Sequence, residues 1–92
     1  MANYQWNKEK NLWLKEVRGI SFEQVVMHIE NGELLDIIKH PNSEKYAKQK
    51  ILIIKINNYI YTVPFVESAD NYFLKTIIPN RAFTKKYLGG KQ

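Results

Sequence analysis

The stretch KILIIKI (50–56), followed by NN (57–58) and YIYTVPFV (59–66), decides which kind of fold this chain forms. Two runs rich in β-branched and aromatic residues flank a pair of asparagines, which tolerate positive φ and suit a two-residue hairpin turn. Pro64 cannot donate to a ladder and marks an edge, a bulge or a strand end. The sequence therefore predicts an antiparallel hairpin. Its second strand alternates between two faces, one with Tyr59, Tyr61, Val63 and Phe65, the other with Ile60, Thr62 and Val66.

Strand composition continues on both sides of this hairpin. Residues 34–39 form one candidate strand and residues 72–78 the last one, while residues 4–6 read as a short strand or an extended lead-in. Pro41 pushes His40 to extended geometry, which predicts a turn or loop over residues 40–43. We therefore expect a sheet of three or four antiparallel strands.

Two helices precede these strands and meet at a tight corner. The first covers residues 8–18 and ends at Gly19. The second begins at Ser21, an N-cap that forms a capping box with Gln24, and the Asn-Gly pair at 31–32 stops it. Three apolar residues of the first helix are expected to point inward: Leu12, Trp13 and Val17. The buried face of the second follows helical spacing and comprises Phe22, Val25, Val26 and Ile29.

A third helix closes the chain. Asn80 is a good N-cap, residues 81–88 can form a short helix, and the glycines at 89–90 end it. The sequence predicts one α+β domain over residues 1–92, with two N-terminal helices, a three- to four-stranded antiparallel sheet and a short basic C-terminal helix. We expect that helix to lie across the sheet beside the N-terminal pair, because short amphipathic elements must bury a face.

The excess positive charge of the chain lies in its last 22 residues. Residues 71–92 hold five bases and no acid, whereas residues 1–70 are balanced, and the formal net charge is +5. Bases without acids on a short segment concentrate a field that attracts polyanions, nucleic acid first among them. A basic tail that only keeps the protein in solution is the alternative.

Composition excludes several classes of protein. The chain has no cysteine, which excludes a disulfide framework and thiolate chemistry and fits a reducing cytosol. No apolar segment follows Met1, so we expect no secretory signal, and the aliphatic run at 51–54 is far too short to span a bilayer. His28 and His40 cannot alone form a catalytic zinc site. We therefore expect a cytoplasmic protein that contacts no membrane and holds neither metal nor cofactor.

The terminal helix carries most of the candidate site residues. Arg81 and Lys85 are four positions apart and share a face, so both can point at one phosphate. Arginine offers a planar fork for phosphate, and lysine offers a point charge or, when desolvated, a base. Lys86 adds another base, and Tyr87 adds a hydroxyl and a stacking ring. The alternative is a solvated helix face with two apolar residues buried beneath it, Phe83 and Leu88.

Two further candidate groups lie outside that helix. His40 stands in a predicted loop, where an imidazole can do acid–base work near neutral pH or serve a structural role. Bases interleaved with an aromatic residue suit single-stranded RNA. The residues of this kind are Lys45, Tyr46, Lys48 and Lys50, with Lys75 as a further RNA-binding candidate.

Four segments in the same order resemble BrnT-type toxins over nearly the whole chain. YQWNKEKN (4–11) is similar to their tryptophan and Asp/Asn followed by a lysine-rich helix, and GISFEQV (19–25) to their Gly-hydrophobic-Ser-Phe-Glu-Glu segment. EKY (44–46) resembles their Glu-Arg-Tyr. IIPNRAFTKKY (77–87) resembles their closing segment IISARKATKKE. The chain departs from that closing segment where Pro79-Asn80 replaces Ser-Ala, Phe83 replaces a small residue and Tyr87 replaces an acid.

The resemblance implies a RelE-like fold and a ribonuclease toxin of a type II toxin–antitoxin pair. Such a protein would cleave RNA without metal, free or on the ribosome, and inhibit translation. A DNA-binding antitoxin of the ribbon-helix-helix type would neutralise it and supply any contact with operator DNA. Arg81 and Lys85 would stabilise the phosphate charge, and Lys86, Tyr87 or His40 would exchange protons. Two other classes stay open: a non-catalytic RNA- or DNA-binding module, and a structural protein whose basic helix docks an acidic protein segment.

Overall fold

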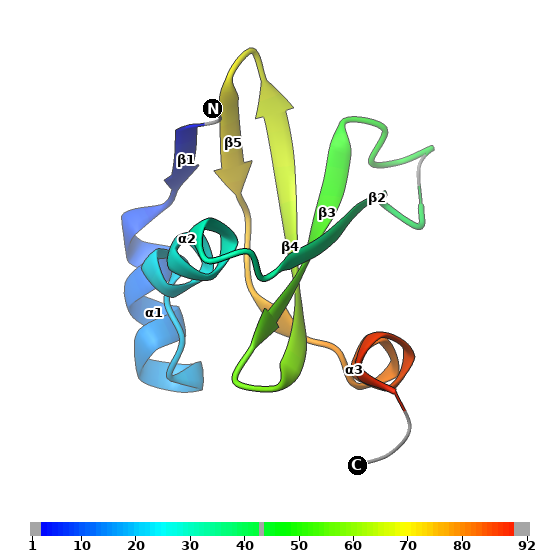
Figure 1. Ribbon diagram of the computed structural model, residues 1–92. Helices are drawn as coiled ribbons and strands as arrows, with labels where there is room; N and C mark the ends of the chain where they lie inside the picture. The colour runs from blue at the N-terminus through cyan, green and yellow to red at the C-terminus, as the bar shows by residue number, and fades with distance from the viewer. Residues whose placement is uncertain (1–2, 43, 90–92) are drawn as a thin grey trace.

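The computed structural model describes residues 3–42 and 44–89, an α+β fold of three helices and six strands within that range (Figure 1). Two parts of the sequence discussed above lie outside the described residues. One is Ser43 of the expected turn, and the other is residues 90–92, with Gly90 of the expected helix end and Lys91 of the basic segment. None of the described helices is long and apolar enough to cross a membrane. The elements in chain order are β1 (Asn3–Trp6), α1 (Lys8–Arg18), α2 (Phe22–Glu30), β2 (Leu34–Lys39), β3 (Gln49–Ile56), β4 (Tyr59–Ser68), β5 (Asn71–Leu74), β6 (Ile78–Pro79) and α3 (Arg81–Leu88).

The predicted hairpin is confirmed as the central pair of the sheet. Strands β3 and β4 pair antiparallel from Ile56 opposite Tyr59 to Gln49 opposite Val66. Asn57 and Asn58 both have positive φ, 53° and 62°, which is the backbone that a tight two-residue turn requires. The alternation expected along β4 also holds for the residues that pack, because Tyr61, Val63 and Phe65 pack with α1 and α2 and Ile60 packs with α3.

The sheet is mixed and has more strands than the sequence indicated. Its order is β1-β5-β4-β3-β2, and β1 pairs with β5 in parallel. The last predicted strand divides into β5 and β6, which both pair with β4. Between β5 and β6, the three residues 75–77 lie opposite only two residues of β4, Val63 and Pro64, as in a β-bulge. Pro64 has no N–H to donate, so the ladder between β4 and the β5–β6 segment breaks there, while the pairing of β4 with β3 continues past it.

The helices cover opposite faces of the sheet, which corrects the expected layout. Helices α1 and α2 lie against one face and α3 against the other, rather than side by side (Figure 1). The reason lies in β3, where four consecutive residues, Ile51 to Ile54, are all buried. A strand buried on both faces needs cover on both. Leu52 and Ile54 pack in the cluster beneath α1 and α2, while Ile51 and Ile53 pack with Phe83, Tyr87 and Leu88 of α3.

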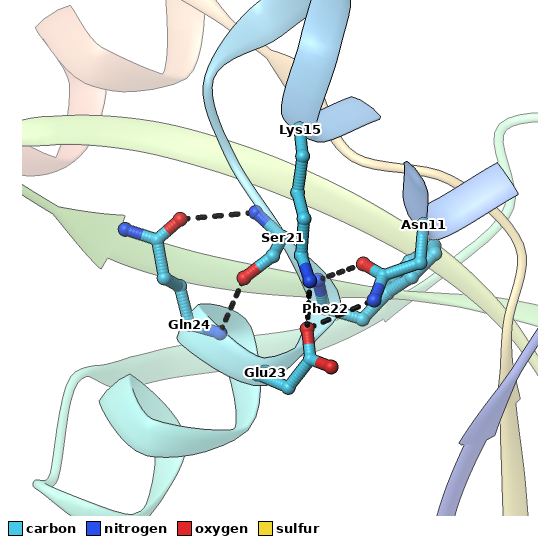
Figure 2. Close-up of polar contacts among 6 residues, drawn as sticks. All are labelled: Asn11, Lys15, Ser21, Phe22, Glu23 and Gln24. Atoms are coloured by element: carbon cyan, nitrogen blue, oxygen red, sulfur yellow. Dashed lines mark hydrogen bonds and ion pairs between the residues drawn. The ribbon is translucent and has the colours of Figure 1, made fainter. Parts of the chain in front are cut away.

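Polar contacts hold α1 against α2 (Figure 2). The predicted capping box is present, since the Ser21 hydroxyl accepts from the Gln24 N–H and the Gln24 side chain accepts from the Ser21 N–H. Buried Asn11 accepts from the Phe22 N–H at 2.8 Å and donates to the Glu23 carboxylate at 2.9 Å. That second bond, more than the nearby Lys15 ammonium, holds the pKa of Glu23 below its usual value.

These contacts explain why the expected inward face of α1 is wrong. The residues that α1 buries are Asn11 and Leu14, whereas the three predicted inward residues are 42–59% exposed: Leu12, Trp13 and Val17. Turning Asn11 toward α2 satisfies the Phe22 N–H and leaves the other face in solvent. Lys10 and Arg18 lie over the Trp13 ring at 4.6 and 5.4 Å, and Arg18 also donates to the Ile77 carbonyl.

Candidate nucleic-acid interface

The basic helix α3 is fastened to the first residues of β4 by its own N-terminal turn. The Asn80 side chain accepts from the Phe83 N–H at 2.8 Å, so Asn80 is the predicted N-cap. The Asn80 N–H donates to the Ile60 carbonyl, and the Ile60 N–H donates to the Thr84 hydroxyl at 2.9 Å. With Phe83 packed on the sheet, this arrangement fixes which side of the helix faces solvent.

The outward side of α3 carries the cations that the sequence singled out. Arg81, Lys85 and Lys86 are exposed. Arg81 and Lys85 lie one helical turn apart, and their side chains form no hydrogen bond or ion pair with any residue that the structure describes. The Lys86 ammonium instead lies 5.8 Å from the Phe83 ring and 5.7 Å from the Tyr87 ring. Two free cations therefore stand side by side, with a third held above two aromatic rings.

Tyr87 is the member of this group that turns toward the protein. Its hydroxyl donates to Oδ2 of Asp36 on β2 at 3.2 Å, and Oδ1 of the same carboxylate accepts from the Ile37 N–H. Partial desolvation, and then the Asp36 carboxylate, raise the pKa of Tyr87, so the phenol stays a hydrogen-bond donor at neutral pH. Sequence reasoning missed Asp36. It lies 51 residues from Tyr87, and only the packing of α3 over β2 brings the two together.

The structure places His40 and its neighbours in the loop between β2 and β3, at the opposite end of β3 from the first turn of α3. The His40 ring lies 4.4 Å from the Tyr46 ring, its Nδ1 accepts from the Asn42 N–H, and Lys45 lies over Tyr46 at 5.4 Å. The His40 N–H donates to the carbonyl of Gln49, the first residue of β3. The start of α3 is bonded to Ile60, which pairs with Lys55 near the other end of β3. Six residues of strand, or roughly 20 Å, separate these two points. The loop therefore lies at the opposite end of β3 from the start of α3 (Figure 1).

The other predicted RNA contacts lie on different faces. Lys50 forms an ion pair with Glu67 at 3.2 Å on the face that α1 and α2 cover in part. Lys48 is exposed in the loop before β3. Lys75 follows β5, and its ammonium lies 5.6 Å from the Phe73 ring. The five residues first grouped by sequence therefore do not form one site, although Lys45 and Tyr46 do touch.

The candidate interface is an open surface. The residues that the structure describes enclose no pocket. Within 3–42 and 44–89, no three His, Cys, Asp or Glu side chains gather where they could hold a metal ion. What the arrangement offers a ligand is positive charge, hydrogen-bond donors and aromatic rings on one helix and the sheet beside it. These are groups that contact phosphate and bases.

No protein-family model, no curated protein and no solved structure matches this chain. The class that its own residues define is an α+β domain with a basic helix presented to solvent on one face of a mixed sheet.

Proposed function

We propose that this protein binds RNA through the outward face of α3 and cleaves it as the ribonuclease toxin of a type II toxin–antitoxin pair. The observation that carries the proposal is the free state of Arg81 and Lys85, two exposed cations without an ion-pair partner among the described residues. A phosphodiester is the ligand class that suits a planar guanidinium beside an ammonium. The resemblance of residues 77–87 to BrnT-type toxins supports cleavage as the outcome of binding.

The reaction would use the RNA 2′-hydroxyl as its nucleophile. This hydroxyl loses its proton to a hydroxide ion of the solvent, which becomes water, while its oxygen attacks the adjacent phosphorus. The bond to the 5′-oxygen breaks and that oxygen takes up a proton, which leaves a 2′,3′-cyclic phosphate and a 5′-hydroxyl end. Arg81 and Lys85 would stabilise the charge on the pentacoordinate phosphate, and Lys86 would supply the proton to the leaving oxygen.

Tyr87 and His40 receive other roles in this proposal. The Tyr87 hydroxyl is bonded to Asp36, so we assign it to holding α3 against β2. His40 packs on Tyr46 at the opposite end of β3 from the turn that starts α3, so we do not assign it to a chemical step with Arg81. Its loop would contact RNA outside the scissile position, with Lys45 over the same ring.

Incubation of the purified protein with a 5′-labelled single-stranded RNA in EDTA tests the proposal. We expect cuts that carry 2′,3′-cyclic phosphate ends, and we expect induced expression to slow bacterial growth with matching cuts in primer extension. RNA that is shifted in a gel but stays intact would support the non-catalytic binding module instead. RNA that is neither shifted nor cut would remove both readings.

We further propose that an antitoxin of the ribbon-helix-helix type neutralises the protein by covering the outward face of α3. Acidic groups on the antitoxin would steer association and keep RNA phosphates away from Arg81. The product of a reading frame adjacent to the gene should elute with this protein as one complex on size exclusion. Two separate peaks would contradict the proposal that this gene product binds the protein.

A further inference from the structure

Part of the sheet face that carries α3 lies beyond the residues that pack on that helix. Packing on α3 involves Ile51, Ile53 and Ile60, on β3 and the start of β4, together with Ile38 of β2. Towards the other end of β4 the register aligns one residue from each of four neighbouring strands. These residues, here called the amide row, are Gln5 of β1, Phe73 of β5, Val66 of β4 and Gln49 of β3.

The amide row has the chemical groups of a surface for bases. Phe73 is 38% exposed, and Lys75 holds its ammonium over that ring. Gln5 lies beside Phe73 on the neighbouring strand, and Gln49 lies two strands from it, beyond Val66. Both carry amides that can donate and accept hydrogen bonds. Strands in a sheet lie about 4.8 Å apart, so the row spans roughly 14 Å, enough for two or three nucleotides.

The charge of this surface favours a negatively charged polymer over a basic or a neutral partner. The described residues that β1, β3, β4 and β5 place on this face include no acid. Glu67 points to the opposite face, where it pairs with Lys50. Asp36 lies on β2 and is bonded to Tyr87. Lys75 is therefore not offset by a carboxylate on these strands, and it forms no ion pair with a residue in 3–42 or 44–89.

The amide row is also connected to the proposed cleavage site along the chain. Residues 73–81 run from the row, past Lys75 and exposed Ile78, to Arg81 at the start of α3 (Figure 1). Ile78 lies opposite Thr62, on the face that α3 covers further along. One extended strand of RNA lying along this path would reach the row and the free cations of α3.

We propose that the amide row binds single-stranded RNA, with one base stacked on Phe73, its neighbours bonded to Gln5 and Gln49, and a phosphate at Lys75. This inference rests on the proposed function in that the ligand is RNA, but it does not require cleavage. A duplex cannot present a base face to a ring on a flat sheet, because its bases are already stacked. The row thus selects unpaired RNA and sets its path towards Arg81.

Fluorescence anisotropy with a labelled single-stranded RNA of about eight nucleotides, in EDTA, tests the row. Phe73→Ala should weaken binding about tenfold to a hundredfold, the range that loss of one stacked base brings, while Phe73→Trp should retain it. Lys75→Ala should weaken binding and reduce the slope of log K against log salt by about 0.7, the loss of one phosphate contact. Ile37→Ala, at an equally exposed apolar residue on β2, is the matched control and should change nothing.

The results separate this inference from the proposed nuclease activity. If RNA binds in a way that depends on Phe73 but is never cut, the amide row is supported and the proposed nuclease activity is contradicted. Cleavage of RNA by the Phe73→Ala variant with unchanged KM would remove the row and leave the nuclease. Equal binding by Phe73→Ala and the parent, equal affinity for duplex RNA, or no RNA binding by the parent would each overturn the proposal. Circular dichroism of each variant checks that the fold is kept.

Discussion

The two faces of the sheet differ in how far they are closed. The cluster beneath α1 and α2 contains eleven buried residues, whereas the cluster beneath α3 contains three. The first face is covered by a helix pair that polar contacts lock together, and the second by one eight-residue helix. This difference indicates that the face beneath α1 and α2 provides most of the core. The face beneath α3 keeps side chains of the sheet exposed, where a ligand could contact them.

The largest expected effect compares a phenylalanine on each face. Phe22 is completely buried and stacks with Trp6, whereas Phe83 is only partly buried on the smaller cluster. Phe22→Ala should therefore cost about 3–5 kcal/mol of unfolding free energy. Phe83→Ala should cost about 1–2 kcal/mol, because less apolar area leaves the core. Urea denaturation of both variants measures the difference, and equal losses would contradict the proposed division between the faces.

A second, smaller effect concerns the buried amide between α1 and α2. Asn11→Ala leaves the Phe22 N–H without its acceptor, which should cost about 1–3 kcal/mol. Lys15→Ala is the control, since its ion pair with Glu23 is 3.7 Å long and exposed on both sides. That variant should change stability by less than about 0.5 kcal/mol. If the two variants are equally stable in urea, Asn11 does not hold the helices together.

The smallest expected effect is a pH dependence at the same corner. The pKa of Glu23 is lowered in the folded protein, chiefly by the hydrogen bond from Asn11, so its contribution is present above the ordinary glutamate pKa of about 4.3. It is lost as the pH falls through the lowered value in the folded state. Urea midpoints measured from pH 7 down to pH 3 should fall less for Glu23→Gln than for the parent. Parallel curves would show that Glu23 titrates alike in both states.

The sequence was sufficient wherever local chemistry determined the structure. The asparagine pair fixed the hairpin, and Ser21 with Gln24 fixed the start of α2, because turns and caps depend on residues that are neighbours in the chain. The N-cap at Asn80 was predicted for the same reason. Elements with strong local signals were thus placed without knowledge of the tertiary fold.

Long-range packing determined what could not be predicted. Three adjacent apolar residues, 12–14, fit a buried face in more than one way, and the contact between Asn11 and Phe22 selects Leu14. The parallel pairing of β1 with β5 joins residues almost seventy positions apart. In the candidate site, Arg81 and Lys85 were found from helical spacing, but the amide row required the register of four strands and left no pattern in the sequence.

The proposed function depends most directly on Arg81, and one set of variants tests it. Cleavage of a single RNA by the parent, Arg81→Ala, Arg81→Lys and Lys8→Ala should be compared, with circular dichroism to confirm folding. Arg81→Ala should lower the rate by about a hundredfold, the loss expected for one electrostatic stabiliser, and Arg81→Lys should recover part of it, since a point charge lacks the planar fork. Lys8→Ala, an exposed cation on α1, should match the parent. A folded and fully active Arg81→Ala protein would contradict the assignment of the site to α3.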